Sequence, residues 1–68
     1  MTIGERIKTE REQRGWSKVE LAKRSGVSDR CIGHYEHGQR EPQFEAIGKI
    51  MEAMGFQMMF TKEGVENE

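Results

Sequence analysis

Three side chains that could bind a metal or react as a thiol lie close together in the chain: Cys31, His34 and His37. On a helix, the first and last of them would drift apart around the axis. A structural zinc site takes four ligands, and no second cluster in the sequence completes such a set. We therefore predict no metal site and no cofactor.

The role of Cys31 has two possible interpretations. At the start of a helix and next to Arg30, its thiol could ionise readily and sense oxidants. The alternative, which we favour, is a small packing residue. No part of the sequence combines a nucleophile, a base and a residue that orients the base, so we do not predict an enzyme.

The same stretch could instead present the outer face of a helix to a partner. The formal net charge is only −1, but residues 1–40 contain nine Lys and Arg against six Asp and Glu, whereas residues 41–68 contain two against six. A basic first half is compatible with binding to nucleic acid, although solvated helix surfaces produce the same pattern.

Start and stop signals divide the first 55 residues into four predicted helices. Capping boxes, in which a hydroxyl precedes a glutamate by three residues, begin at Thr2 and Ser17, and Ser28 is a further N-cap. A glycine that can adopt the left-handed conformation follows each helix. The predicted helices span 3–14, 18–25, 29–37 and 43–54.

Apolar residues at helical spacing indicate the inner faces. We expect Ile3 and Ile7 to be buried in the first helix, and hydrophobic staples to join Trp16 to Leu21 and Val27 to Ile32. The inner face of the last helix is predicted from the spacing of Phe44, Ile47, Ile50, Met51 and Met54.

The join between the second and third helices is the most informative feature. Two short helices separated by a turn containing Gly26, with Val27 plugging the angle, form a helix-turn-helix. An ordinary helical hairpin is the alternative.

These signals resemble the lambda-repressor-like, Cro-type (XRE) helix-turn-helix domains, from about Ile3 to Gly55. The matching residues are Arg11, Gly15-Trp16-Ser17, Leu21-Ala22, Gly26-Val27-Ser28, Ile32, Glu36-His37-Gly38, Arg40-Glu41-Pro42 and Ile50. The resemblance implies a compact bundle of four helices in which residues 29–37 form the recognition helix. It also implies an ion pair between Arg11 and Glu36 that fixes the pitch of this helix.

A recognition helix reads bases mainly with residues near its N-terminus. The outward positions are Asp29, Arg30, Gly33 and His34, the candidate base contacts. Arg30 suits O6 and N7 of guanine. Asp29 could accept from cytosine, orient Arg30, or simply be favoured by the helix dipole. Gly33 costs about 1 kcal/mol of helix stability, which close approach to a groove would explain, although drift at an unused site is the alternative.

Residues at helix ends are candidates for holding the phosphate backbone. The family usually has glutamine after the N-cap of the second helix, and this chain has Lys18 there. The candidate phosphate contacts are Lys18, Ser28, His37, Gln39 and Arg40, with solvated charge as the alternative for each.

The residues after Gly55 alternate as in a strand: Phe56, Met58 and Phe60 face one way. A single strand needs a partner, and a chain of 68 residues has a thin core, so we predict pairing with a second copy. Some antitoxins of this family dimerise in this way, whereas a fifth helix is the alternative. The predicted divisions are a DNA-binding domain at 1–55, a dimerisation strand at 56–61 and a polar tail at 62–68.

Together these features predict an all-α domain that binds double-stranded DNA as a homodimer and represses transcription from an inverted repeat. The alternatives are an antitoxin that also binds a cognate toxin, a restriction–modification controller, and a protein-interaction module. A lone cysteine and the lack of a long apolar run lead us to expect a cytoplasmic protein without a membrane partner.

Overall fold

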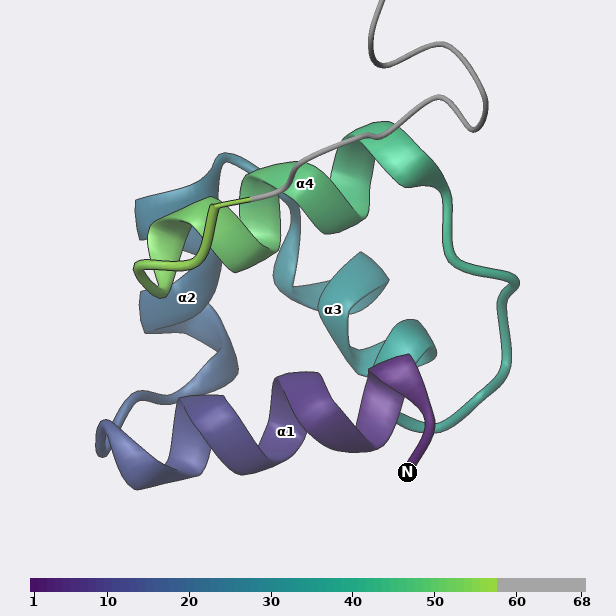
Figure 1. The fold of residues 1–68 in the computed structure, drawn as a ribbon, viewed down its shortest axis with the longest axis horizontal. Coiled ribbons are helices and arrows are strands. Elements are labelled where there is room, and N and C mark those ends of the chain that lie inside the picture. Colours follow the sequence, from purple (N-terminus) through teal and green to yellow (C-terminus); the bar gives the residue numbers. More distant parts are fainter. Residues whose placement is uncertain (58–68) are drawn as a thin grey trace, which may run out of the picture.

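The computed structural model describes residues 1–57, and Figure 1 shows four helices in this part of the chain. They are α1 (Ile3–Gln13), α2 (Lys18–Ser25), α3 (Asp29–Glu36) and α4 (Phe44–Ala53). Both ends of α2 and the starts of α1 and α3 are as predicted, whereas the ends of α1 and α3 and both ends of α4 differ by one residue. Within residues 1–57, no helix has the length and hydropathy needed to cross a bilayer.

Side-chain caps begin the first three helices. The capping box of α1 is complete, because Thr2 Oγ1 accepts from the Glu5 N–H at 3.1 Å and Glu5 Oε1 accepts from the Thr2 N–H at 3.0 Å. The second predicted box is only half formed. Ser17 Oγ accepts from the Glu20 N–H at 3.0 Å, but the Glu20 carboxylate accepts from Arg24 instead of turning back to the cap.

Glycines in the left-handed conformation end the helices, as predicted. At the end of α1, Gly15 has a φ of 73°, its N–H donates to the Glu12 carbonyl, and the Trp16 N–H reaches back to the Arg11 carbonyl at 3.1 Å. This pair of hydrogen bonds defines a Schellman motif. The same pattern recurs after α3 and α4, so these chain reversals satisfy carbonyls that the helices leave unpaired.

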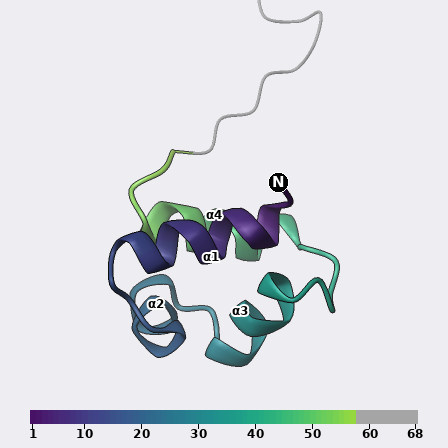
Figure 2. The same cartoon turned by 90° about the horizontal axis from the view of Figure 1, so that it is seen from below.

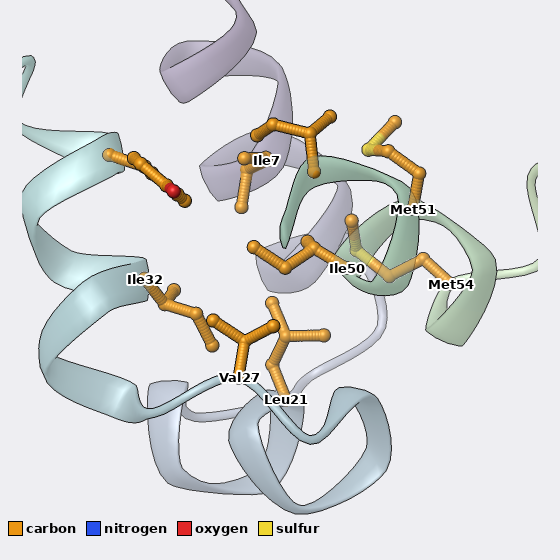
Figure 3. Packing of buried hydrophobic residues seen from close by; sticks show 9 residues of the cluster. Ile7, Leu21, Val27, Ile32, Ile50, Met51 and Met54 are labelled. Atoms are coloured by element: carbon orange, nitrogen blue, oxygen red, sulfur yellow. The ribbon is translucent and has the colours of Figure 1, made fainter. Parts of the chain in front are cut away.

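The helices form two layers around one core. Figure 2 shows α1 and α4 on one side and α2 and α3 on the other. Side chains from all four helices and the α2–α3 turn meet between the layers, as Figure 3 shows. The buried apolar residues are Ile7, Leu21, Val27, Ile32, Tyr35, Ile47, Ile50, Met51 and Met54.

Two residues predicted to lie in the core are exposed. Ile3 is 37% exposed, because α1 turns the neighbouring Gly4 towards α3 instead. Phe44 is 59% exposed, since the buried stripe of α4 begins one turn later, at Ile47. The spacing of both residues fits a core face, but each lies at the first position of its helix, where packing against the neighbouring layer has not begun.

Phe56 departs from the predicted strand. Its N–H donates to the Met51 carbonyl at 3.0 Å as part of the Schellman motif after α4, and its half-buried ring packs against the core of its own chain. Arg14 donates to the Met54 carbonyl at 2.6 Å and lies over the Phe56 ring. Phe56 thus completes the cap after α4, and residues 56 and 57 are not assigned to a strand. The remaining strand and tail predictions, including Met58 and Phe60, fall outside residues 1–57.

Candidate nucleic-acid interface

The turn between α2 and α3 sets the angle of a helix-turn-helix. Gly26 has a φ of 80°, and its N–H donates to the Ala22 carbonyl at 2.8 Å. The next residue, Val27, inserts into the core, and its N–H donates to Ser25 Oγ at 3.1 Å. Ser28 Oγ then caps α3 by accepting from the Cys31 N–H at 3.1 Å. Only three residues therefore reverse the chain, and the N–H groups of Gly26 and Val27 both donate back to α2.

The inner face of α3 is held by the core. Ile32 and Tyr35 are buried, and Ile32 points towards Val27 and Leu21 in Figure 3. Burial raises the pKa of the Tyr35 phenol, as does its contact with Cys31. The Tyr35 oxygen also accepts from the backbone N–H of Gln43 at 3.4 Å. Gln43 precedes α4, so this contact ties α3 to the start of the last helix.

Arg11 and Glu36 join α1 to the end of α3. Nε and Nη2 of Arg11 donate to the two carboxylate oxygens of Glu36 at 2.8 Å and 2.9 Å, and Nη1 donates to the Trp16 carbonyl at 2.9 Å. The two side chains are only 10% and 2% exposed. The hydrogen bonds that Arg11 donates to Glu36 raise the pKa of the Arg11 guanidinium, although burial opposes this. The paired fork fixes α3 at a set distance and pitch against α1.

Gly4 is a positioning residue that sequence reasoning missed. A β-carbon at Gly4 would overlap the Tyr35 carbonyl oxygen and lie 3.3 Å from the Glu36 Cα. The backbone of α1 therefore touches the last turn of α3 directly. A glycine inside a predicted helix was the available signal, because such a residue costs helix stability and calls for a packing reason.

The predicted base contacts lie on one side of α3. Asp29 and Arg30 are exposed in its first turn, and Gly33 and His34 are partly buried further along. Neither Asp29 nor Arg30 forms an ion pair within residues 1–57, so Asp29 does not orient Arg30 here. The guanidinium of Arg30 is therefore available to a partner.

The predicted phosphate contacts lie at the start of α2 and around the two ends of α3. Lys18 starts α2, and Ser28 precedes α3 with its hydroxyl already accepting one hydrogen bond, which leaves its proton to donate. His37 Nδ1 lies 2.8 Å from the Gly33 carbonyl, so only Nε2 can face a ligand. The Gln39 N–H donates to the His34 carbonyl at 2.8 Å, so a contact from Gln39 to a phosphate would have to come from its exposed side chain.

Ion pairing separates the cations into two groups. Arg6 and Arg14 pair with Glu10, Arg11 pairs with Glu36, and Arg24 pairs with Glu20 while stacking 4.2 Å from the Trp16 ring centroid. The cations of the α2–α3 layer and the following loop that form no ion pair within the described chain are Lys18, Lys23, Arg30 and Arg40. Three of these four are predicted DNA contacts.

Cys31 is half buried against the core, and Nη1 of Arg40 lies 3.9 Å from its sulfur. The cation beside this thiol is therefore Arg40, and not Arg30 as the sequence suggested. In the part of the chain that the structure covers, no three His, Cys, Asp or Glu side chains gather as they would around a metal ion.

A four-helix domain with a three-residue turn and an outward-facing third helix defines the helix-turn-helix class of protein. A family model described as helix-turn-helix matches residues 7–58, and the chain belongs to this family, HTH_3. No solved structure matches the chain.

Two kinds of relatives are similar to this chain over most of its length. An "uncharacterized HTH-type transcriptional regulator" of Mycobacterium tuberculosis is 35% identical over 54 residues, which is 79% of this chain and 21% of the relative. The "SPbeta prophage-derived uncharacterized HTH-type transcriptional regulator YonR" of Bacillus subtilis is 31% identical over 62 residues, 91% of this chain and 57% of the relative. The chain thus spans about a fifth of the mycobacterial relative and somewhat over half of YonR.

Proposed function

We propose that this protein is a sequence-specific DNA-binding regulator of transcription, with α3 as the helix that enters the major groove. The observation that carries the proposal is the division of α3 into two faces. The buried pair between Arg11 and Glu36 holds one face, while the other presents Arg30 without an ion pair in residues 1–57. Membership of the helix-turn-helix family supports the same function, as do the names of the relatives, which describe them as HTH-type transcriptional regulators.

In this proposal, Arg30 reads a guanine through a bidentate hydrogen bond, and Asp29 and His34 adjoin the neighbouring base pairs. The remaining contacts hold the DNA backbone and fix the register of α3. They are Lys18, Ser28, His37, Gln39 and Arg40. Because α3 has only eight residues, a few side chains near its start determine the preferred sequence.

The proposal also includes the assembly. Two copies related by a two-fold axis would place their α3 helices about 34 Å apart, one turn of DNA, so the binding site would be an inverted repeat. A homodimer bound across a promoter would act as a repressor by excluding other proteins. A cognate toxin was the alternative partner, but no contact in residues 1–57 favours it, and we do not propose it.

Selection of bound fragments from random duplex DNA tests the function directly. The expected result is a short inverted-repeat consensus. Arg30→Ala should weaken specific binding by about 1–3 kcal/mol and relax the preference at one base pair in each half-site. Lys18→Ala should weaken all sequences alike and lower the slope of log K against log salt by about one.

Two results of this selection contradict the proposal. Recovery of no preferred sequence by the parent protein would exclude sequence-specific binding. An unchanged consensus for Arg30→Ala, with normal folding, would show that Arg30 does not read a base.

A further inference from the structure

The methylenes of Lys18 pass beside Gly33 on α3. A β-carbon built at Gly33 would lie 3.8 Å from Cδ and 3.9 Å from Cε of Lys18. Beyond the backbone of α3 and the neighbours of Gly33, these two methylenes are the only heavy atoms of residues 1–57 within 4 Å of that point. The stem of Lys18 therefore crosses from the start of α2 to the middle of α3.

The two ends of Lys18 are in different environments. Its backbone follows the Ser17 cap, which fixes the first turn of α2 through the hydrogen bond to Glu20. Lys18 is half buried, its stem lies near Gly33 of α3, and its ammonium group forms no ion pair within the described chain. Long cationic side chains commonly lay their methylenes on a neighbouring surface while the charged end stays in water. The course of the stem past Gly33 thus places the charged end of Lys18 beside α3.

We propose, on the basis of the proposed function, that Gly33 and Lys18 act as one unit. Gly33 leaves room for the stem of Lys18, and the stem carries the ammonium group to a DNA phosphate at the rim of the groove. Gly33 is then a positioning residue that acts through Lys18. This assignment differs from the sequence-based interpretation, in which Gly33 allows the backbone of α3 to approach the DNA directly.

Gly33 has two proposed roles, which are to position Lys18 or to let the backbone of α3 approach DNA closely. Side chains of different size at this position distinguish them. The β-carbon of Gly33→Ala would rest on Lys18 at ordinary van der Waals distance, so the lysine stays seated. We expect this variant to bind the selected duplex within two-fold of the parent. If the backbone of α3 needed close approach to DNA, the added methyl group would already weaken binding.

Gly33→Leu should have the opposite effect, because its branched end would occupy the space of the Lys18 stem. Loss of one phosphate contact at a salt slope of about 0.9 corresponds to about five-fold weaker binding at about 0.15 M salt. The slope itself should fall by about one. Leucine favours helix more than glycine does, so α3 should stay folded, which circular dichroism and urea unfolding would verify.

A double-mutant cycle measured on the selected duplex decides the question. Lys18→Ala alone should show the same loss and the same change in salt slope as Gly33→Leu. The double variant should bind no more weakly than either single variant, because either single change already removes the phosphate contact of Lys18. Lys8→Ala removes a charge from an exposed position on α1, in the other layer, and should leave both affinity and slope unchanged.

Three results overturn this inference. Losses that multiply in the double variant would mean that Gly33 and Lys18 act separately. Weakened binding by Gly33→Ala, or an unchanged salt slope in Gly33→Leu, would contradict seating of the lysine. These results all require specific binding by the parent. If the parent protein binds no specific sequence, the proposed function is refuted, and the inference with it. Failure of the inference alone is therefore distinguishable from failure of the proposed function.

Discussion

At the scale of single residues, the buried contacts behind α3 determine how it is presented. Glu36 is almost fully buried and receives both donors of the Arg11 fork, while the third donor of Arg11 satisfies the Trp16 carbonyl. A buried pair of this kind does not by itself imply high stability, because desolvation offsets much of the attraction. It does make the position of α3 sensitive to loss of either partner.

We expect Glu36→Ala to lower the free energy of unfolding by about 3–5 kcal/mol, because it leaves a guanidinium buried without a counterion. Urea unfolding followed by circular dichroism measures this. The matched control is Glu20→Ala, which breaks a surface pair with Arg24 whose side chains are 37% and 49% exposed and should cost at most about 1 kcal/mol. Equal losses of unfolding free energy in the two variants would show that the buried pair contributes no more to stability than the surface pair.

Tyr35 gives a prediction for alkaline pH. Because burial raises the pKa of its phenol in the folded state, the folded protein favours the neutral form. The resulting stability is complete below the unfolded pKa of about 10 and is lost as the pH rises through the folded pKa.

Tyr35 is the single tyrosine of the chain, so its ionisation can be followed by ultraviolet absorbance without overlap from another phenol. We expect the phenol of the folded protein to ionise at a higher pH than the phenol of the urea-unfolded chain. Tyr35→Phe should remove this group's share of the stability lost at alkaline pH. A phenol that titrates alike in the folded and unfolded chains would show that burial does not act as we infer.

At the scale of elements, side-chain caps determine where the first three helices start, and the glycine motifs determine where the helices stop. Ser28 combines two tasks, because it caps α3 by accepting from the Cys31 N–H and lies beside the face proposed to meet DNA. These tasks can be separated, since aspartate is an N-cap as good as serine but carries a charge that phosphate repels.

Ser28→Asp should therefore keep the stability of the domain and weaken DNA binding, whereas Ser28→Ala should cost about 1 kcal/mol of stability through loss of the cap. Unfolding midpoints and affinity for the selected duplex, measured on both variants, give the comparison. Undiminished DNA binding by Ser28→Asp would place Ser28 away from the phosphate backbone.

At the scale of the whole molecule, the assembly determines what DNA site the protein can occupy. Phe56 packs against its own chain and caps the C-terminus of α4, so it is part of the folded domain. A test of dimerisation must therefore keep Phe56. Deletion of residues 58–68 satisfies this condition, because it leaves the Schellman motif and the contact with Arg14 in place.

We expect the chain that ends after Gln57 to be a folded monomer that binds half-sites weakly, and the full chain to be a dimer. Sedimentation velocity gives the masses, and Met58→Pro in the full chain is the companion variant, since proline removes one backbone donor from a strand. A shortened chain that remains a tight dimer would place the interface within residues 1–57.

The sequence by itself determined the helices, because their signals are local. The Thr2, Ser17 and Ser28 caps and the glycines after each helix act within a few residues, so three to four positions suffice to predict a boundary. The resemblance to a known family supplied the role of α3 and the pairing of Arg11 with Glu36. Neither follows from local spacing, because these two residues are 25 positions apart.

Only the tertiary structure decided which side chains are covered. Spacing alone cannot tell Ile3 from Gly4, because the choice depends on how closely α1 approaches the Tyr35 backbone. It cannot tell that the Phe56 N–H returns to Met51, because an alternating pattern leaves the backbone partner open. The approach of the Lys18 stem to Gly33 likewise arises from the packing of α2 against α3, a long-range geometry that no short stretch of sequence encodes.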